Sequence, residues 1–446
     1  MSAIVGGGQL PLWLGWVVCL VLQEFIGLSL AELSSAFPTS AGSHYATYRL
    51  APQGSRRFAA YLTGWVVLVG NLTITLSVTF GFASLLAACI TIAKPEFAAT
   101  NWQLLLIFYA ILVATFAICL LGNRFLPFVD SFCAGYTLLV IFLVLIVLPS
   151  TADERHSASY TLGHFDSTLS GWGGFGFAIG LLPSAYCFSA LGMITSMSEE
   201  VSSPETSVPW ALSLAVPVGL VAGLFFIIPI CATLPPLADI VEAGASSGQA
   251  LPYIFATVTG SPGGGVGLTV LVLILTLFCC ISITTAASRM FWSFARDHGI
   301  PFGDFFSVID AKFGVPRNAL VLLTVVQMLL GLIYLGSTSA FNAFVATGVI
   351  ALAVSYAIPI AMSAISDRRR TVNAASWHLP PMLGWFANFI ALLWVAFQAV
   401  LFSMPTVLPT SETAMNYASV VLVGLMTLSL VWYALGGRKQ FVVPTA

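Results

Sequence analysis

The sequence predicts an all-α protein that crosses a membrane many times. Of its 446 residues, 59% are hydrophobic and only 7% are Asp, Glu, Lys or Arg, against about 25% charged residues in an ordinary soluble domain. Apolar runs of about 20 residues, the length of a membrane-spanning helix, recur from Leu12 to Leu435. Such runs satisfy their backbone groups in lipid only as helices, and the alternating pattern of a barrel strand is absent.

Charged residues, prolines and glycines divide the apolar runs into eleven expected spans. They form one transmembrane domain over residues 1–435, followed by a cytoplasmic tail at 436–446. The expected spans are 13–36, 58–92, 102–122, 127–148, 174–196, 208–234, 265–292, 318–336, 340–365, 383–405 and 414–435.

The positive charges give this arrangement a direction. All of the 15 lysines and arginines except Lys94 and Arg155 fall on the same side of the expected spans. Loops rich in Lys and Arg stay in the cytoplasm, so the C-terminus is expected inside and the N-terminus outside. With 17 acidic residues and a net charge of −2, the chain lacks the dense basic face that nucleic acid requires.

The sequence indicates neither a cofactor nor a metal. The 8 cysteines lie inside apolar runs, and the 5 histidines lie in loops without metal-ligand spacing. We find no catalytic triad, zinc-protease motif or phosphate-binding loop, so an enzyme is not expected.

The fifth expected span differs from the others because five glycines and Pro183 lie between Gly171 and Tyr186. A proline removes a backbone donor and frees a carbonyl, which is tolerated at mid-membrane only against protein, water or a ligand. Broken helices of this kind supply ligand sites in secondary transporters. The alternative is an unbroken helix whose small residues allow close packing.

Polar side chains interrupt two further spans, at residues 70–77 and 279–285. Hydroxyls in membrane helices usually bond back to their own carbonyls, which gives them a structural interpretation. Together with a broken span they also suit a polar binding site.

Three acids lie in or beside expected spans. Glu24, about halfway along its span, is interpreted as a proton site, a counter-charge for a cation, or a neutral acid hydrogen-bonded in the bundle. Glu32 and Asp130 lie nearer the cytoplasmic ends, where we expect them to pair with loop arginines such as Arg124 or Arg289.

Four stretches carry a family resemblance: SLAELSSAFPTSAGSHY at 29–45, SMSEEVSSPETSVPWAL at 196–212, ASRMFWSFARDHGIPF at 287–302 and ETAMNYASVVL at 412–422. They resemble the amino acid, polyamine and organocation permease superfamily, and look most like its fungal choline and gamma-aminobutyrate (GABA) permease group. The resemblance extends over essentially the whole chain.

This resemblance implies a five-plus-five inverted repeat, two further helices, and alternating access around a site where the first and sixth family helices unwind. The span at 174–196 matches the sixth. The residues implied near the solute are Pro183, Ser184, Tyr186, Cys187, Phe188, Ser189, Gly70, Asn71, Thr75 and Ser282. Glu32, Arg289 and Arg296 are implied at the cytoplasmic gate.

The chain departs from the family pattern in two places. Family members commonly carry an acid shortly before the Ser-Glu-Glu motif, whereas residues 190–193 here read Ala-Leu-Gly-Met, which counts against choline. Residues 1–9 match the family's loop between its first and second helices, so the expected fold lacks the first family helix and has eleven spans.

The resulting functional hypothesis is a proton-coupled permease for a small nitrogenous solute, in the plasma membrane or the vacuolar membrane. Amino acids and GABA are the first candidates, and choline and polyamines the second. The alternatives are a transport-deficient sensor, a regulatory paralogue of a full-length permease, or the product of a shortened gene.

Overall fold

The computed structural model describes residues 2–166, 168–366, 371–410 and 415–442. Within these residues, eleven helical segments are long and apolar enough to cross a membrane, as the sequence predicts. They are α2 (Gln9–Ala36), α4 (Arg56–Ala93), α5 (Asn101–Leu121), α6 (Leu126–Thr151), the segment Gly173–Met197, α10 (Pro204–Ala232), α13 (Pro262–Arg296), α15 (Arg317–Gly336), α16 (Thr338–Ile365), α17 (Pro381–Leu401) and α18 (Ala418–Trp432) with its continuation to Gln440.

The last span differs most from its expected bounds. After α18 the chain makes a π-helical turn at Tyr433–Gly437 and continues as α19 (Arg438–Gln440), so the expected tail begins inside a helix. Phe441 is then fully buried, where its ring meets those of Tyr61 and Phe294. This aromatic contact explains why the chain stays ordered beyond the predicted end of the span.

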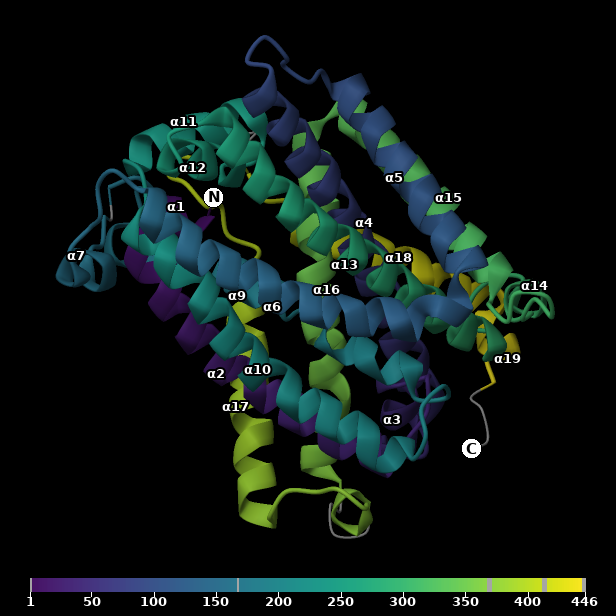
Figure 1. Cartoon of the computed structure of the whole chain (residues 1–446). Coiled ribbons are helices and arrows are strands. Elements are labelled where there is room, and N and C mark those ends of the chain that lie inside the picture. The colour runs from purple at the N-terminus through teal and green to yellow at the C-terminus, as the bar shows by residue number, and fades with distance from the viewer. Residues whose placement is uncertain (1, 167, 367–370, 411–414, 443–446) are drawn as a thin grey trace.

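Helices at corresponding places in the two halves pack against each other. α2 contacts α10, α4 contacts α13, and α5 contacts α15, and Figure 1 shows α5 and α15 side by side. In a five-plus-five repeat without the first helix, these are the second, third and fourth members of each half. α17 and α18 follow the repeat and pack on α2, α4 and α16.

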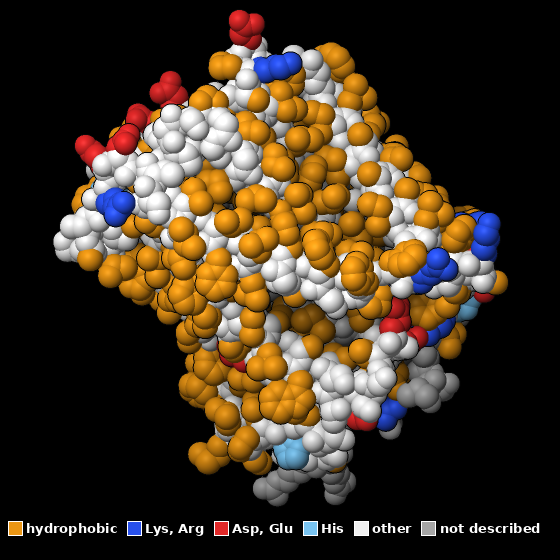
Figure 2. All heavy atoms as spheres, in the orientation of Figure 1, with side chains coloured by type: hydrophobic (Ala, Val, Ile, Leu, Met, Phe, Trp, Pro, Cys, Tyr) orange, Lys and Arg blue, Asp and Glu red, His pale blue; other side chains and the backbone are white. Residues whose placement is uncertain are grey.

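The buried core lies where α2, α4, α10, α13 and α16 meet, and its largest cluster includes Leu20, Ile74 and Leu212. The outer surface is also apolar. Hydrophobic side chains cover most of the face seen in Figure 2, with the few charged ones mostly toward its two ends. Phe128 and Leu435, for example, are 72% and 78% exposed. A lipid environment accounts for this surface, which would aggregate in water.

The N-terminal residues do not form the expected loop. They form a short helix, α1 (Ser2–Val5), whose Ala3, Ile4 and Val5 are buried. A Cβ added to Gly6 would lie 2.6 Å from the Gly176 carbonyl oxygen and 2.7 Å from the Gly180 nitrogen. The glycines therefore let two backbones meet, and burial of α1 follows from its apolar side chains.

Short helices complete the connections: α3 (Ser43–Leu50), α7 (Ala158–Gly163), α11 (Leu237–Ser247), α12 (Leu251–Val258) and α14 (Gly303–Phe306). α3 lies against α4 and α16, and the ring of its His44 is buried and pairs with Asp297 at 2.8 Å. Arg368, Arg369 and Arg370, which enter the orientation prediction, and residues 412–414 of the last motif lie outside the described residues.

Candidate functional site

The segment Gly173–Met197 is a broken helix, as its glycines and Pro183 predict. A 3₁₀ turn (Gly173–Phe175) leads into α8 (Gly176–Ile179), then α9 (Leu182–Cys187), then a 3₁₀ helix, η3 (Leu191–Met197). Pro183 lies in the first turn of α9, where its missing N–H breaks no helical hydrogen bond. The proline thus begins a new helix after the first interruption.

Tyr356 of α16 satisfies the backbone at the second interruption. Its buried hydroxyl donates to the Ser189 carbonyl at 3.0 Å and accepts from the Gly192 N–H at 3.1 Å. Gly192 is required for this approach, because an added Cβ would lie 2.3 Å from Cε1 of Tyr356. Two backbone groups that would be costly to leave unpaired are thus held by one side chain.

Gln23 of α2 holds the same interruption from the other side. Its amide Nε2 donates to the Phe188 carbonyl at 3.1 Å. Its Oε1 accepts from Trp394 at 3.0 Å and from Gln398 at 3.2 Å, both on α17. The broken span is therefore fixed to α2, α16 and α17 by side chains whose own polar atoms are paired.

A fourth helix contacts the broken span through Tyr186. The hydroxyl groups of Tyr186 and Ser77 lie 2.6 Å apart, which links α9 to α4. The ring of the next aromatic residue, Phe188, turns toward α2 and α10, where it meets Trp16 with centroids 5.8 Å apart. The interruption thus directs two aromatic side chains to different helices.

A cavity of about 410 Å³ lies beside the break, between α6, η3 and α13. Its walls are mostly apolar side chains, and its polar lining residues are Asn123, Asp130, Glu200, Ser282 and Thr285. The Ser282 hydroxyl donates to Oδ1 of Asp130 at 3.0 Å. The expectation that Asp130 pairs with Arg124 or Arg289 is therefore wrong, because Arg289 faces Glu200 and Arg124 lies over the Phe125 ring. The full lining is Asn123, Leu126, Pro127, Asp130, Ala190, Met193, Ile194, Met197, Glu200, Cys279, Ser282, Ile283, Thr285 and Ala286.

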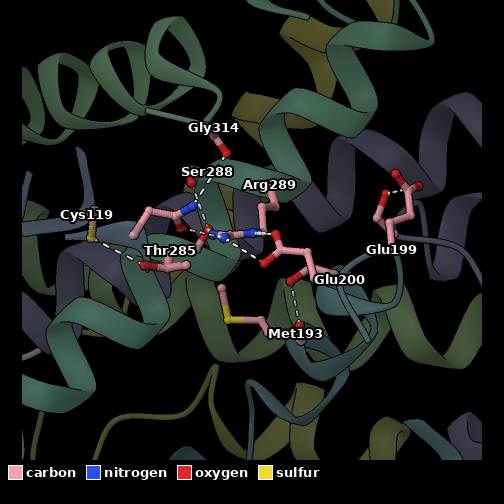
Figure 3. A network of polar contacts seen from close by, with 11 residues as sticks. Cys119, Met193, Glu199, Glu200, Thr285, Ser288, Arg289 and Gly314 are labelled. Carbon is pink, nitrogen blue, oxygen red and sulfur yellow. Dashed lines mark hydrogen bonds and ion pairs between the residues drawn. The ribbon is translucent and has the colours of Figure 1, made fainter. Parts of the chain in front are cut away.

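Arg289 joins α13 to the end of the broken span at the rim of this cavity. Figure 3 shows its guanidinium pointing at the carboxylate of Glu200. Nη2 of Arg289 donates to Glu200 at 3.0 Å and to the Asn123 side chain at 3.1 Å. Nη1 donates to the Thr285 carbonyl at 3.3 Å, and the side chain is 7% exposed, so the guanidinium is held by Glu200, Asn123 and Thr285.

A second ion pair joins the same two segments. Its acid, Glu199, precedes Glu200, and its arginine, Arg296, lies two helical turns after Arg289 on α13. Arg296 contacts the Glu199 carboxylate at 3.3 Å, and the Ser40 hydroxyl donates to the same carboxylate at 2.5 Å. Burial raises the pKa of Glu199, but the hydrogen bonds from Ser40 and Arg296 and the charge of Arg296 outweigh burial, so the pKa lies below its ordinary value. Both acids of the Ser-Glu-Glu motif therefore bind arginines of α13.

The predicted gate residue Glu32 lies elsewhere. Its Oε1 accepts from the backbone N–H of Leu379, at the approach to α17, at 3.1 Å. The acidic partners of the two predicted gate arginines, Glu199 and Glu200, were not singled out from the sequence. Their signal was the motif itself, in which two adjacent acids follow a broken span.

The residues predicted near the solute separate into two groups. Ser282 lines the cavity. Cys187, whose thiol is exposed, and Tyr186, whose hydroxyl bonds to Ser77, lie on the broken span but not in the lining of the cavity. Others are packed: Gly70 lies against Leu352, and Ser184 and Ser189 are buried. Asn71 and Thr75 bond back to the carbonyls of Val67 and Asn71 in their own helix. A role for these packed residues in binding stays a prediction.

Glu24 lies on α2 beside η3 and α10. Its Oε2 is buried and accepts no hydrogen bond from the part of the chain that the structure describes. A Cβ added to Gly27 would lie 3.8 Å from this oxygen and 3.2 Å from Leu191. Ionisation of a carboxyl in this position would cost free energy, because the charge would lose its hydration without gaining a hydrogen bond. Among the described polar groups of α2, Glu24 is the one with a buried, unpaired side-chain oxygen.

Comparisons with known proteins agree with this architecture. The family model "Amino acid permease" matches residues 2–426. The chain is 31% identical to a choline transporter of Saccharomyces cerevisiae, over 99% of this chain and 78% of the relative. It is 31% identical to a polyamine transporter of the same yeast, over 99% and 72%. It is 30% identical to an amino-acid permease of Oryza sativa subsp. japonica, over 98% and 86%.

The broken span, the cavity beside it and the paired arginines and glutamates all lie within the matched region. The eleven apolar helices place the protein in a membrane. The chain therefore belongs to the amino acid permease family and is an integral membrane transporter.

Proposed function

We propose that the protein is a proton-coupled secondary transporter of small nitrogenous solutes that works by alternating access. The observation that carries this proposal is the broken span beside the 410 Å³ cavity. Interrupted helices at such a site supply fixed backbone dipoles and can change packing without unfolding.

The solute class is supported by the cavity and by the named relatives. The cavity combines mostly apolar walls with the hydrogen-bonded carboxylate and hydroxyl of Asp130 and Ser282, which suits a small molecule that has a nitrogen group and an alkyl part. The relatives described above are named for choline, polyamines and amino acids, which share this chemistry.

The gate in this proposal consists of the two ion pairs between the turn that follows η3 and α13. The Arg289–Glu200 and Arg296–Glu199 pairs tie the cytoplasmic end of the broken span to α13. Separation of these pairs would let η3 move relative to α13 and change access to the cavity. The concentration of Lys and Arg on this face supports its cytoplasmic orientation and that of the C-terminus. The plasma membrane is the proposed location.

The proton site in this proposal is Glu24. A protonated carboxyl avoids the cost of a buried charge. Oε2 of Glu24 lies beside Gly27, and Gly27 faces Leu191 of η3. Protonation can therefore change the packing between α2 and the broken span.

The test is uptake of labelled GABA, choline and lysine into permease-deficient cells, at an external pH of about 5 and about 7. We expect saturable uptake of at least one solute that is greater at the acidic pH. Absence of uptake of every solute, with the protein verified in the plasma membrane, would contradict the proposal.

Glu24→Gln tests the coupling separately. We expect this variant to lose most of the difference between the two pH values while it still binds solute. Glu242→Gln is the matched control, because Glu242 is an exposed acid on α11. An unchanged pH dependence in Glu24→Gln would remove Glu24 from the coupling mechanism.

A further inference from the structure

We propose that Asp130 is the counter-charge for the solute, so that the cavity selects solutes with a net positive charge over zwitterions. The inference rests on the proposed transport function and specifies its solute class. It concerns the wall of the cavity formed by α6, which faces η3 and α13.

Among the described residues that line this cavity, Asp130 is the acid without an ion pair. Among the lining residues, all within the described part of the chain, the charged ones are Asp130 and Glu200. Glu200 is neutralised by Arg289. No ion pair formed by the described residues includes Asp130.

The hydrogen bond from Ser282 fixes the carboxylate without neutralising it. Ser282 donates to Oδ1 at 3.0 Å, and both side chains are exposed to the cavity. The broken span adds no charge on the facing wall, where it contributes Ala190, Met193, Ile194 and Met197. A carboxylate held in an apolar cavity attracts a cation more strongly than the same group in water.

The apolar wall matches the remainder of an organic cation. Met193, Met197 and Ile283 can contact methyl or methylene groups, and thioether side chains adapt to different shapes. A zwitterion would have to place its own carboxylate in a cavity whose unpaired charge is negative. The arrangement therefore favours quaternary ammonium compounds and protonated amines without a carboxylate.

The first test compares solutes in Asp130→Asn, which keeps the size of the side chain. We expect the KM for choline and putrescine to rise roughly tenfold, and that for GABA to change less than about twofold. Asp304→Asn is the control of equal charge, because the Asp304 side chain is 97% exposed on the short helix α14. Equal effects on cations and zwitterions, or none, would overturn the inference.

The second test uses the thiol of Cys279, which is exposed and lines the same cavity. Ser282 follows it by three residues, so both side chains lie on the same face of α13. The purified protein is treated with a methanethiosulfonate that carries a trimethylammonium group or a sulfonate group. The thiol displaces methanesulfinate and forms a mixed disulfide, and peptide mass spectrometry follows its formation at Cys279.

We expect the cationic reagent to react roughly tenfold faster than the anionic one in the unmodified protein. The ratio should fall toward one in Asp130→Asn and stay unchanged in Asp304→Asn. An unaltered ratio in Asp130→Asn would overturn the inference. Because labelling needs no transport, a charge-selective cavity in a protein without uptake would refute the proposed function alone.

Discussion

The hydroxyl of Tyr356 accepts a hydrogen bond from the backbone N–H of Gly192 at 3.1 Å, across 164 residues of sequence. The same hydroxyl donates to the Ser189 carbonyl, so one oxygen spans the interruption between α9 and η3. A regular helix would satisfy these two backbone groups itself. The shape of the broken span therefore depends on a side chain of another helix.

Tyr356→Phe should destabilise the protein by about 1–3 kcal/mol, because it leaves a buried carbonyl and a buried N–H without their partner. We also expect uptake to fall several-fold at equal surface expression. Thermal unfolding in detergent and initial uptake rates measure the two effects. Tyr109→Phe is the control, since Tyr109 donates to Met328 at 2.7 Å far from the break. That variant should lose stability and keep its KM; a Tyr356→Phe protein with wild-type uptake would show that the bridge is dispensable.

Gly192→Ala should be among the most damaging small substitutions in the broken span. Its Cβ would lie 2.3 Å from Cε1 and 2.7 Å from Cζ of Tyr356, and the ring is buried. Overpacking of this kind costs roughly 1–3 kcal/mol. Gly174→Ala provides the comparison, because an added Cβ there has no atom within 4 Å. Equal melting temperatures and uptake in the two variants would contradict the predicted clash.

The Arg289–Glu200 pair should show energetic coupling in a double-mutant cycle. Arg289 is 7% exposed while Glu200 is 48% exposed, so water compensates part of the loss and we expect a coupling of about 1–2 kcal/mol. Thermal unfolding of Arg289→Gln, Glu200→Gln and the double variant measures it. Arg317→Gln, which removes a more exposed pair with Asp310, should have less effect. Strict additivity would mean that the two side chains do not stabilise each other.

The lowered pKa of Glu199 predicts a specific pH dependence of stability. A carboxyl whose folded-state pKa is below its unfolded value stabilises the protein above the unfolded pKa, about 4.3 for Glu, and the contribution is lost as the pH falls further. The melting temperatures of the unmodified protein and Glu199→Gln should differ most near neutral pH and converge in acid. Glu96→Gln, in an exposed loop, should show little difference at any pH. A difference that grows in acid would refute the assignment.

The spans could be predicted because each is encoded in its own residues. Apolar length and flanking charges are local properties, so α4 and α15 begin and end within two residues of the expected bounds. The break was also predictable, since glycines and Pro183 act on their own backbone. The π-helical end of the last span, by contrast, depends on where Phe441 is buried, which no local pattern shows.

The candidate site was only partly predictable for the same reason. Gln23 was visible as an amide inside an apolar run, but its partners Phe188 and Trp394 lie 165 and 371 residues away. Tyr356 has no local signal, because tyrosines are common in membrane helices. Asp130 is visible as an acid in the sequence, but its pairing was predicted wrongly, because no local pattern shows that Ser282, 152 residues away, lies beside it in space.

The amide of Gln23 couples the broken span mechanically to a helix outside the repeat. Movement of the end of α9 away from α2 must break the bond to the Phe188 carbonyl, or pull on Trp394 and Gln398 through the same side chain. α17 therefore opposes this movement through the three hydrogen bonds of the Gln23 amide. Substitution of Trp394 or Gln398 therefore changes the restraint on the broken span without altering any residue that lines the cavity.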